Sequence, residues 1–179
     1  MFDSPEPTPE NYRKYEKNTG IPWIIDRNLS LKLTKKHGKF IGMRRGWWGQ
    51  AATLEPPLVP FPIPAEMFLP TCDAFKKSKE SDDITVLLTG RHLGLKPQIL
   101  RILAEGKLLD DKFFFHCRGE NGPKTSENKP PETFPWKIWM IEQYREIYSP
   151  ETVEIWEDKA DYAQRFREFN GNFLVNLVK

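Results

Sequence analysis

From residue 84 onward the sequence alternates short apolar runs with amphipathic segments, and this alternation limits the folds that the chain can adopt. The run at 84–92 (ITVLLTGRH) is too short for a helix, consists mainly of β-branched residues and leucine before its TGRH end, and follows a polar segment. Such a run predicts a strand buried on both faces, as in a parallel sheet. Pro97 opens a helical stretch that ends near Gly106, so strand, Thr-Gly turn and helix form one βα unit.

The same pattern recurs toward the C-terminus. Further strands are predicted at 112–117 (KFFFHC), 153–158 (VEIWED) and 172–178 (NFLVNLV), and further helices at 133–148 and 159–169. A long polar loop without core residues joins the strand at 112–117 to the helix at 133–148. Strands and helices alternating on this scale predict an α/β fold of the Rossmann-like type, with a parallel sheet and helices on both faces.

The first 64 residues differ in composition. Five prolines lie within 56–64, and they exclude a helix or a central strand there. We therefore expect an irregular, basic and proline-rich segment over 1–64, acting as an extended arm and cap-like insert. The α/β core is expected over 65–179, within one domain overall, and it begins with helical pieces interrupted near Pro70.

Positive charge is concentrated in one stretch, although the net charge of the chain is only +2. Residues 28–54 contain no acidic side chain and lead through a basic run into Gly46-Trp47-Trp48-Gly49. The basic residues are Lys32, Lys35, Lys36, Lys39, Arg44 and Arg45. Cations beside aromatic rings suit a nucleic-acid strand, because phosphates attract the former and bases stack on the latter. The alternative is a solvated basic face with both tryptophans packed inward.

Other features exclude several classes of protein. Cys72 and Cys117 are too far apart for a paired-cysteine zinc site and too few for a disulfide framework, so we expect two ordinary thiols. The three histidines are dispersed and favour neither a metal site nor a Ser-His-Asp triad. The sequence has no segment that reads as a membrane span or a secretion signal, so we expect an intracellular protein, in the cytoplasm or an organelle matrix, without a membrane partner.

Functional groups follow the predicted strands at their carboxyl ends, where sites collect in parallel α/β sheets. Thr89 follows the apolar part of the first strand, which ends at Leu88, Lys137 lies early in the helix at 133–148, and Glu157 and Asp158 follow Trp156 in the strand at 153–158. Thr89 can donate to a phosphate oxygen, Lys137 can neutralise its charge, and the two carboxylates can hold Mg²⁺. The structural alternative is that the acidic pair caps a helix and the lysine lies on the surface.

The order of these groups resembles the haloacid dehalogenase (HAD) superfamily of phosphohydrolases, in which a strand ends in Thr or Ser, a lysine follows, and an acidic cluster comes last. More closely, the chain is similar to the HAD domain of the Swiss Army Knife RNA repair family. The segments that bear this resemblance cover nearly the whole chain: Phe2-Asp3-Ser4-Pro5, Gly46-Trp47-Trp48, Val86 to Arg91, Thr133-Phe134 with Lys137, and Ile155 to Lys159.

The resemblance implies a nucleophilic aspartate on a central strand just before the Phe2-Asp3-Ser4-Pro5 turn, in an Asp-x-Asp-x-Thr motif. This sequence begins where that strand would end, and Asp3 lies past the turn, so we do not expect Asp3 to replace the nucleophile. A further strand is therefore expected from elsewhere in the chain or from a partner protein, unless the neighbouring strands close the gap. Asp161 stands where related sequences lead us to expect histidine, and it adds a carboxylate to the metal site.

Two functions follow from the resemblance. One is a Mg²⁺-dependent phosphohydrolase acting on nucleic-acid ends or nucleotides, with Arg91, Lys36, Arg44 and Arg45 binding the substrate. The other is a catalytically inactive HAD-like protein that binds RNA or serves as a structural subunit of an assembly. A third interpretation, a flavodoxin-like or other Rossmann-like binding module, lacks the glycine-rich phosphate loop that it needs.

Overall fold

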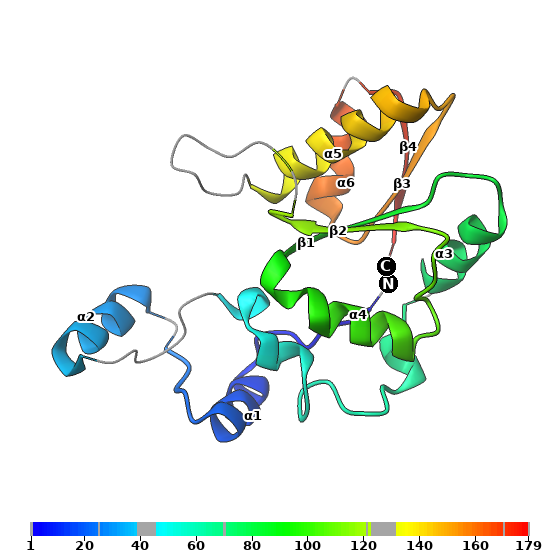
Figure 1. Ribbon diagram of the computed structural model, residues 1–179. Helices are drawn as coiled ribbons and strands as arrows, with labels where there is room; N and C mark the ends of the chain where they lie inside the picture. The colour runs from blue at the N-terminus through cyan, green and yellow to red at the C-terminus, as the bar shows by residue number, and fades with distance from the viewer. Residues whose placement is uncertain are drawn as a thin grey trace.

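The computed structural model describes the chain except for residues 1, 25, 39–45, 70, 121, 123–131, 170 and 179. Strands and helices alternate from residue 71 onward, and further helices precede them (Figure 1). The protein is therefore a mixed α/β structure with short parallel strands. In the described ranges, no helix has an apolar stretch of the length that a bilayer crossing requires.

Two helices form in the N-terminal region, where the sequence analysis expects irregular structure. Helix α1 spans Pro9–Thr19, and the hydroxyl of Thr8 caps it by accepting a hydrogen bond from the Asn11 amide at 3.2 Å. Helix α2 spans Arg27–His37 and is capped in the same way by Asp26. A glycine in the left-handed conformation follows each helix. These residues define both ends of each helix through local contacts. The many prolines in the region led the sequence analysis to expect irregular structure instead.

An aromatic cluster fixes α1 against the Gly-Trp-Trp-Gly segment. Trp47 is 3% exposed, its indole N–H donates to the Pro5 carbonyl at 2.7 Å, and its ring lies 5.5 Å from that of Trp23. Tyr15 is buried in the same cluster. Trp48, in contrast, is 42% exposed. Of the two tryptophans, one therefore belongs to the core and the other reaches the surface.

The proline-rich segment contributes to the core. Its backbone is non-helical, as the sequence predicts, but Val59 is fully buried and packs with Leu54 and Ile63 against Ile102. Prolines exclude regular structure without excluding burial of the apolar residues between them. Short 3₁₀ helices flank this segment and the first strand: η1 (Trp47–Gly49), η2 (Ala51–Leu54), η3 (Ala65–Met67) and η4 (Leu93–Leu95).

The first strand pair follows the predicted βα order. The elements are α3 (Thr71–Glu80), β1 (Val86–His92), α4 (Lys96–Glu105) and β2 (Phe114–Arg118). The break before α3 falls where the sequence predicts it, near Pro70. Leu87 of β1 packs on a cluster formed by α3 and α4, and β1 is half-buried along its whole length. The burial on both faces that its composition predicts is therefore incomplete. Cys72 and Cys117 are both buried.

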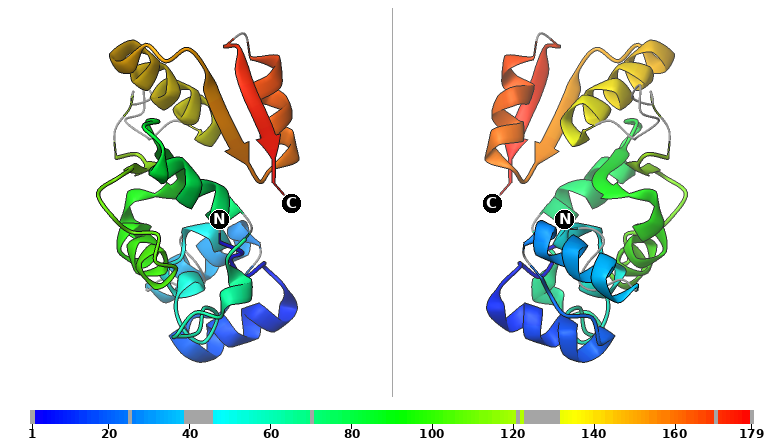
Figure 2. Two further views of the ribbon diagram at one scale, coloured as in Figure 1. Left: turned by 90° about the vertical axis from the view of Figure 1, so that its right-hand side faces the viewer. Right: turned by 90° about the vertical axis from the view of Figure 1, so that its left-hand side faces the viewer.

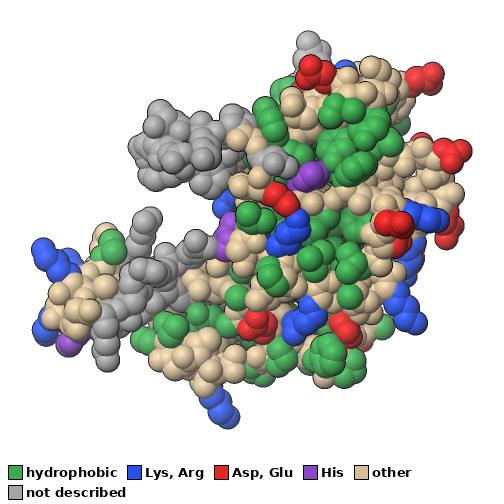
Figure 3. All heavy atoms as spheres, viewed as in Figure 1, with side chains coloured by type: hydrophobic (Ala, Val, Ile, Leu, Met, Phe, Trp, Pro, Cys, Tyr) green, Lys and Arg blue, Asp and Glu red, His purple; other side chains and the backbone are tan. Residues whose placement is uncertain are grey.

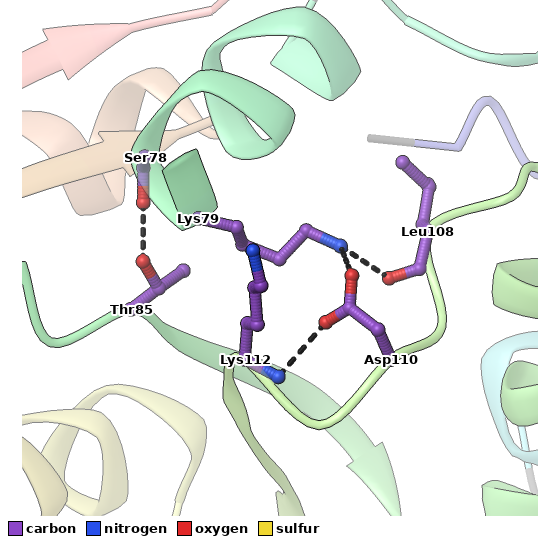
Figure 4. A network of polar contacts seen from close by, with 6 residues as sticks. All are labelled: Ser78, Lys79, Thr85, Leu108, Asp110 and Lys112. Carbon is purple, nitrogen blue, oxygen red and sulfur yellow. Dashed lines mark hydrogen bonds and ion pairs between the residues drawn. The ribbon is translucent and has the colours of Figure 1, made fainter. Parts of the chain in front are cut away.

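A buried lysine joins α3 to the segment before β2 (Figure 4). The ammonium of Lys79 donates to the Leu108 carbonyl at 2.9 Å and forms an ion pair with Asp110. It also lies 5.0 Å from the ring centre of Phe75 and 5.4 Å from that of Phe113. These contacts satisfy a cation that would otherwise be costly to bury.

The second strand pair also has the predicted elements. They are α5 (Thr133–Tyr148), β3 (Val153–Glu157), α6 (Ala160–Glu168) and β4 (Phe173–Leu177). Helix α6 packs on β3 and β4 through the buried side chains of Ala163 and Phe166. Figure 2 shows these strands side by side, at the end of the molecule opposite α1.

The strands form two sheets where the sequence predicts one. β1 pairs in parallel with β2, from Val86↔Phe114 onward, and β3 pairs in parallel with β4, from Val153↔Phe173 onward. Within the described residues no strand lies between β1 and β3, so the two pairs remain separate. The prediction of parallel pairing holds, whereas a continuous sheet with helices on both faces does not form from this part of the chain.

Candidate phosphate site

The start of α5 brings the carboxyl ends of the two strand pairs together. A Cβ atom added to Gly90 would lie 2.6 Å from Thr133 Cγ2, so the end of β1 contacts the first residue of the helix. Arg118, at the end of β2, donates to Thr133 Oγ1 at 3.3 Å. One turn later along α5, Lys137 reaches the end of β3. The first turns of α5 therefore position groups from three strands around one point.

Lys137 and Glu157 form the ionic centre of this point. The Nζ atom of Lys137 lies 2.5 Å from Oε2 of Glu157, and their side chains are 14% and 3% exposed. The other carboxylate oxygen of Glu157 accepts a hydrogen bond from the Lys159 amide at 3.2 Å. Among the described residues, Glu157 is the hydrogen-bond partner of the Lys137 ammonium, which lies 5.5 Å from the centre of the Tyr162 ring, and Lys137 lines a cavity.

The two adjacent carboxylates differ in their protonation behaviour. Burial raises the pKa of Glu157, and a hydrogen bond with Asp158 raises it further, against the opposing effect of Lys137. Burial also acts to raise the pKa of Asp158, but the hydrogen bond from Glu157 and the charge of Lys137 outweigh it, so the pKa of Asp158 lies below its ordinary value. At neutral pH Asp158 therefore retains a full negative charge beside the Lys137–Glu157 pair.

A cavity of about 2010 Å³ opens onto these groups. Every residue of β1, including Thr89 in the middle of the strand, and every residue of β3 lines it, together with Lys137 and Asp158. Thr89 is half-buried, and its hydroxyl oxygen accepts a hydrogen bond from the Arg91 amide at 3.3 Å, which leaves the hydroxyl proton available to a ligand. Thr89 thus presents a neutral donor from the β1 side, where Arg91 also lines the cavity, and Lys137 and Asp158 present charged groups beside β3.

Arg91 connects the cavity to the N-terminal region. Its guanidinium donates to the Trp48 carbonyl at 3.0 Å and to the Ser4 hydroxyl at 2.9 Å, and it lies 5.3 Å from the centre of the Trp48 ring. The sequence analysis assigns Arg91 to substrate binding. In the structure, Arg91 is half-buried and lines the cavity, and its contacts hold Ser4 and the exposed Trp48 at the edge of the cavity.

The other predicted site residues lie elsewhere. Asp161 is exposed in the first turn of α6 and does not line the cavity. Lys36 is exposed in the last turn of α2, which stands apart from the strands in Figure 1. Arg44 and Arg45 lie outside the described residues. Thr89, Lys137, Glu157 and Asp158 therefore line one cavity, with Lys137, Glu157 and Asp158 adjacent to one another, whereas Asp161 and Lys36 do not line it.

The site supplies only some of the oxygen ligands that a magnesium ion needs. Mg²⁺ is usually held by one or two carboxylates and completes its coordination with water and phosphate oxygens. Asp158 is ionised and faces the cavity, whereas both oxygens of Glu157 already accept hydrogen bonds. In the part of the chain that the structure describes, no three His, Cys, Asp or Glu side chains gather at one point. Beside Lys137, the described residues thus offer one open carboxylate, that of Asp158, rather than a complete ligand cage.

The sequence analysis gives no role to two residues at the site, Thr133, which it names only within a segment of the resemblance, and Tyr162, which it does not name. Thr133 forms the contact between α5 and the ends of β1 and β2, and Tyr162 lies within 5.5 Å of the cations of both Lys137 and Lys159. The sequence signal for Thr133 was its position as the first residue of a helix that follows a long loop. Nothing in the local sequence distinguishes Tyr162 from an ordinary helix residue.

Comparison with known proteins extends these observations. Residues 71–177 match the family model described as HAD domain family 1 in Swiss Army Knife RNA repair proteins. Searches of the curated proteins and of the solved structures returned no match. The matched range begins with α3 and includes both strand pairs, α5 and all four residues that the structure brings together.

Proposed function

Because the chain belongs to HAD domain family 1 of Swiss Army Knife RNA repair proteins, we propose that it is a phosphohydrolase-type domain whose substrates are phosphate esters at nucleic-acid ends or on nucleotides. The observation that supports this most directly is the position of Lys137. Its ammonium is nearly buried, is shared with one carboxylate, and faces a cavity that a phosphate can enter. A cation placed in this way stabilises the negative charge of phosphoryl oxygens.

Each wall of the site has a separate role. Thr89 donates its hydroxyl proton to a phosphate oxygen from the β1 side, and Lys137 neutralises charge from the β3 side. Asp158 would hold Mg²⁺, which when bound supplies a second positive charge to the phosphate. Glu157 positions Lys137 through the 2.5 Å ion pair and holds its ammonium beside the cavity.

Hydrolysis also requires a nucleophile. Asp3 is an exposed carboxylate that lines the cavity, and its amide donates to the Met67 carbonyl at 2.8 Å. The sequence analysis does not favour Asp3 for this role, because it follows a turn instead of ending a strand. An Asp3→Asn variant separates an enzyme that uses this residue from one that does not.

The exposed ring of Trp48 favours a second candidate, a catalytically inactive protein that binds RNA. The ring is 42% exposed, lies against the guanidinium of Arg91, and borders the cavity. An aromatic face supported by a cation is a suitable surface for stacking a base. In this candidate, Thr89 and Lys137 bind a phosphate without cleaving it.

The test is phosphate release from a 3′-phosphorylated RNA oligonucleotide by the 179-residue chain, with Mg²⁺ and with EDTA. We expect Mg²⁺-dependent release that falls by about 100-fold or more in Lys137→Met and Asp158→Ala. Asp161→Ala is the matched control, since its carboxylate is outside the cavity, and it should retain activity.

Other outcomes distinguish the two candidates. Absence of release, with RNA retained in a salt-sensitive manner that Trp48→Ala weakens, supports the binding protein. Release that is unaffected by Lys137→Met contradicts the proposed phosphate site. Absence of both release and retention contradicts both candidates.

A further inference from the structure

We propose that Arg118 and Thr133 form a second anion-binding subsite at the carboxyl end of the β1–β2 pair, for a ligand with a phosphate on both the 3′ and the 5′ oxygen of one sugar. Lys137 holds one of these phosphates and Arg118 holds the other. The inference rests on the proposed function, because it takes Lys137 as the group that binds the first phosphate.

Arg118 is a cation without an anionic partner among the described residues. It is the last residue of β2, is half-buried and lines the cavity. Its Nη1 atom donates to Thr133 Oγ1 at 3.3 Å, and its Nε atom is buried without a hydrogen-bond partner. The nearby carboxylate of Glu120 pairs instead with Lys96. The hydration that the guanidinium loses is therefore not replaced by a carboxylate, and a phosphate would replace it.

The surroundings of Thr133 leave room for a ligand beside Arg118. Thr133 Oγ1 accepts the hydrogen bond from Arg118, so its hydroxyl proton is available to a ligand. Gly90, Gly119 and Thr133 all line the cavity. A Cβ atom on Gly90 would lie 3.2 Å from Thr133 Oγ1, so a side chain there would obstruct the hydroxyl. A guanidinium fork and a hydroxyl donor that open onto the same cavity suit the oxygens of one phosphate.

Helix α5 sets the distance between the two subsites. Thr133 and Lys137 are four residues apart, so they lie on the same face of the helix with a rise of about 6 Å between them. Arg118 is joined to the first of these residues, and Glu157 holds the second. The two phosphates of a diphosphate share one bridging oxygen and are closer than one helical turn. Phosphates on the 3′ and 5′ oxygens of one sugar are separated by the whole sugar, which matches this spacing better.

The distribution of charge distinguishes the two subsites. Lys137 shares its charge with Glu157. At the end of β1, the guanidinium of Arg91 also lines the cavity, and its hydrogen-bond partners are neutral oxygens. The strand register pairs His92 with Arg118, so the two arginines end neighbouring strands. Among the described residues, no ion pair with a carboxylate compensates this positive charge. A second phosphate compensates it, whereas a single phosphate on Lys137 does not.

Calorimetric titration with small nucleotides tests the proposal. The probes are adenosine 3′,5′-bisphosphate, adenosine 3′-monophosphate and adenosine 5′-diphosphate. Each is titrated into the 179-residue chain in EDTA, and again with Ca²⁺ in place of Mg²⁺ to prevent hydrolysis. The diphosphate controls for charge, because both of its phosphates are attached through one sugar oxygen. We expect the affinity for the 3′,5′-bisphosphate to exceed that for either other nucleotide by about tenfold or more.

Three variants locate the second phosphate. Arg118→Gln removes the charge and should weaken binding of the bisphosphate by about tenfold, while affinity for the 3′-monophosphate stays within about twofold. Arg118→Lys retains the charge without the fork and should keep part of the preference. Arg145→Gln is the matched control, because Arg145 lines the cavity near the other end of α5, and it should retain the whole preference. Since nucleotides are compared within one variant, a general loss of folding would not imitate the effect.

The dinucleotide ApAp, which ends in a 3′-phosphate, distinguishes a strand end from a free nucleotide. Its other phosphate is a diester between the nucleosides. Equal affinity for ApAp and the bisphosphate assigns the subsite to strand ends, and binding of ApAp that is weaker by about tenfold assigns it to free nucleotides. Both results support the proposal when Arg118→Gln removes the preference for the bisphosphate.

Other results would overturn the proposal. Equal affinity for the bisphosphate and the 3′-monophosphate would remove the second subsite and leave the proposed function intact. A preference for the bisphosphate that survives in Arg118→Gln would do the same. Absence of binding by every nucleotide under both conditions would contradict the phosphate site at Lys137 and, with it, this inference.

Discussion

Two regions of this protein each bury a lysine beside a carboxylate, and they differ in what else surrounds the cation. Lys79 is enclosed by the Leu108 carbonyl, Asp110 and two phenyl rings, and neither Lys79 nor Asp110 lines the cavity. Lys137 has Glu157 as its hydrogen-bond partner within the described residues and faces the cavity. The first region uses its cation to join elements of the fold, whereas the second keeps donors available for a ligand.

The surroundings of the two lysines differ as well: those of Lys79 are enclosed, and those of Lys137 are open. On the Lys79 side, the rings of Phe75 and Phe113 complete the enclosure of the ammonium, while the side chain of Asp110 remains 38% exposed. On the Lys137 side, β3 and β4 are covered by α6 on one face, while Trp156 and Leu174 remain exposed. A closed environment is suited to stability and an open one to binding.

Apolar side chains also reach the surface over α5 (Figure 3), and Ile147 of this helix is 70% exposed.

The largest effect is expected at Lys137. Lys137→Met leaves the carboxylate of Glu157 buried without its cation, which should lower the free energy of unfolding by about 3–5 kcal/mol. Chemical denaturation measures this loss. The double variant Lys137→Met/Glu157→Gln should recover most of the stability, because no unpaired charge remains. If it recovers none, the ion pair is not the source of the effect.

A smaller effect is expected at Gly90, where β1 meets α5. In Gly90→Ala the new Cβ would lie 2.6 Å from Thr133 Cγ2, and the resulting overpacking should cost about 1–3 kcal/mol. Thr133→Ser removes that methyl group, so adding it to Gly90→Ala should restore part of the loss. Thermal unfolding of the four members of this cycle gives the coupling, and strictly additive effects would exclude the contact.

Lys79→Met should have a smaller effect still and should leave ligand binding intact. The Leu108 carbonyl loses a donor in a buried position, which costs about 1–2 kcal/mol. Phosphate release or RNA retention, whichever the chain shows, should remain unchanged. If Lys79→Met impairs that activity as much as Lys137→Met does, the distinction between the two lysines fails.

The smallest effect concerns His116 of β2, whose ring nitrogen Nε2 lies 2.7 Å from the hydroxyl of Tyr144 in α5. Burial lowers the pKa of His116 below its ordinary value of 6.5. The unfolded chain then binds a proton more readily than the native one, so stability is complete above pH 6.5 and declines as the pH falls through the native pKa. Denaturation between pH 7.5 and about pH 5 should show this decline.

His116→Gln provides the control for this measurement. Glutamine does not titrate, so its stability should change less over the same pH range. An equal decline in both proteins would assign the pH dependence to other groups.

Local sequence determined most of the element order. The strands around Val86, Phe114, Val153 and Phe173 and the helix at Thr133–Tyr148 lie where apolar periodicity predicts them, since periodicity and strand length are properties of a short window. The capping residues Thr8 and Asp26 were equally local signals for α1 and α2, but the many prolines nearby led to a prediction of irregular structure.

Tertiary structure decided which groups meet. Glu157 binds Lys137 across 20 positions of sequence, and Arg91 binds Ser4 across 87, whereas Asp161, only four residues after Glu157, lies outside the cavity. Trp47 and Trp48 are adjacent and chemically identical, yet one is buried and the other exposed. The sequence by itself specified the residue types and the elements that bear them. Their convergence depended on the packing of α5 against two strand pairs, because the direction of a side chain is set by neighbours that are distant along the chain.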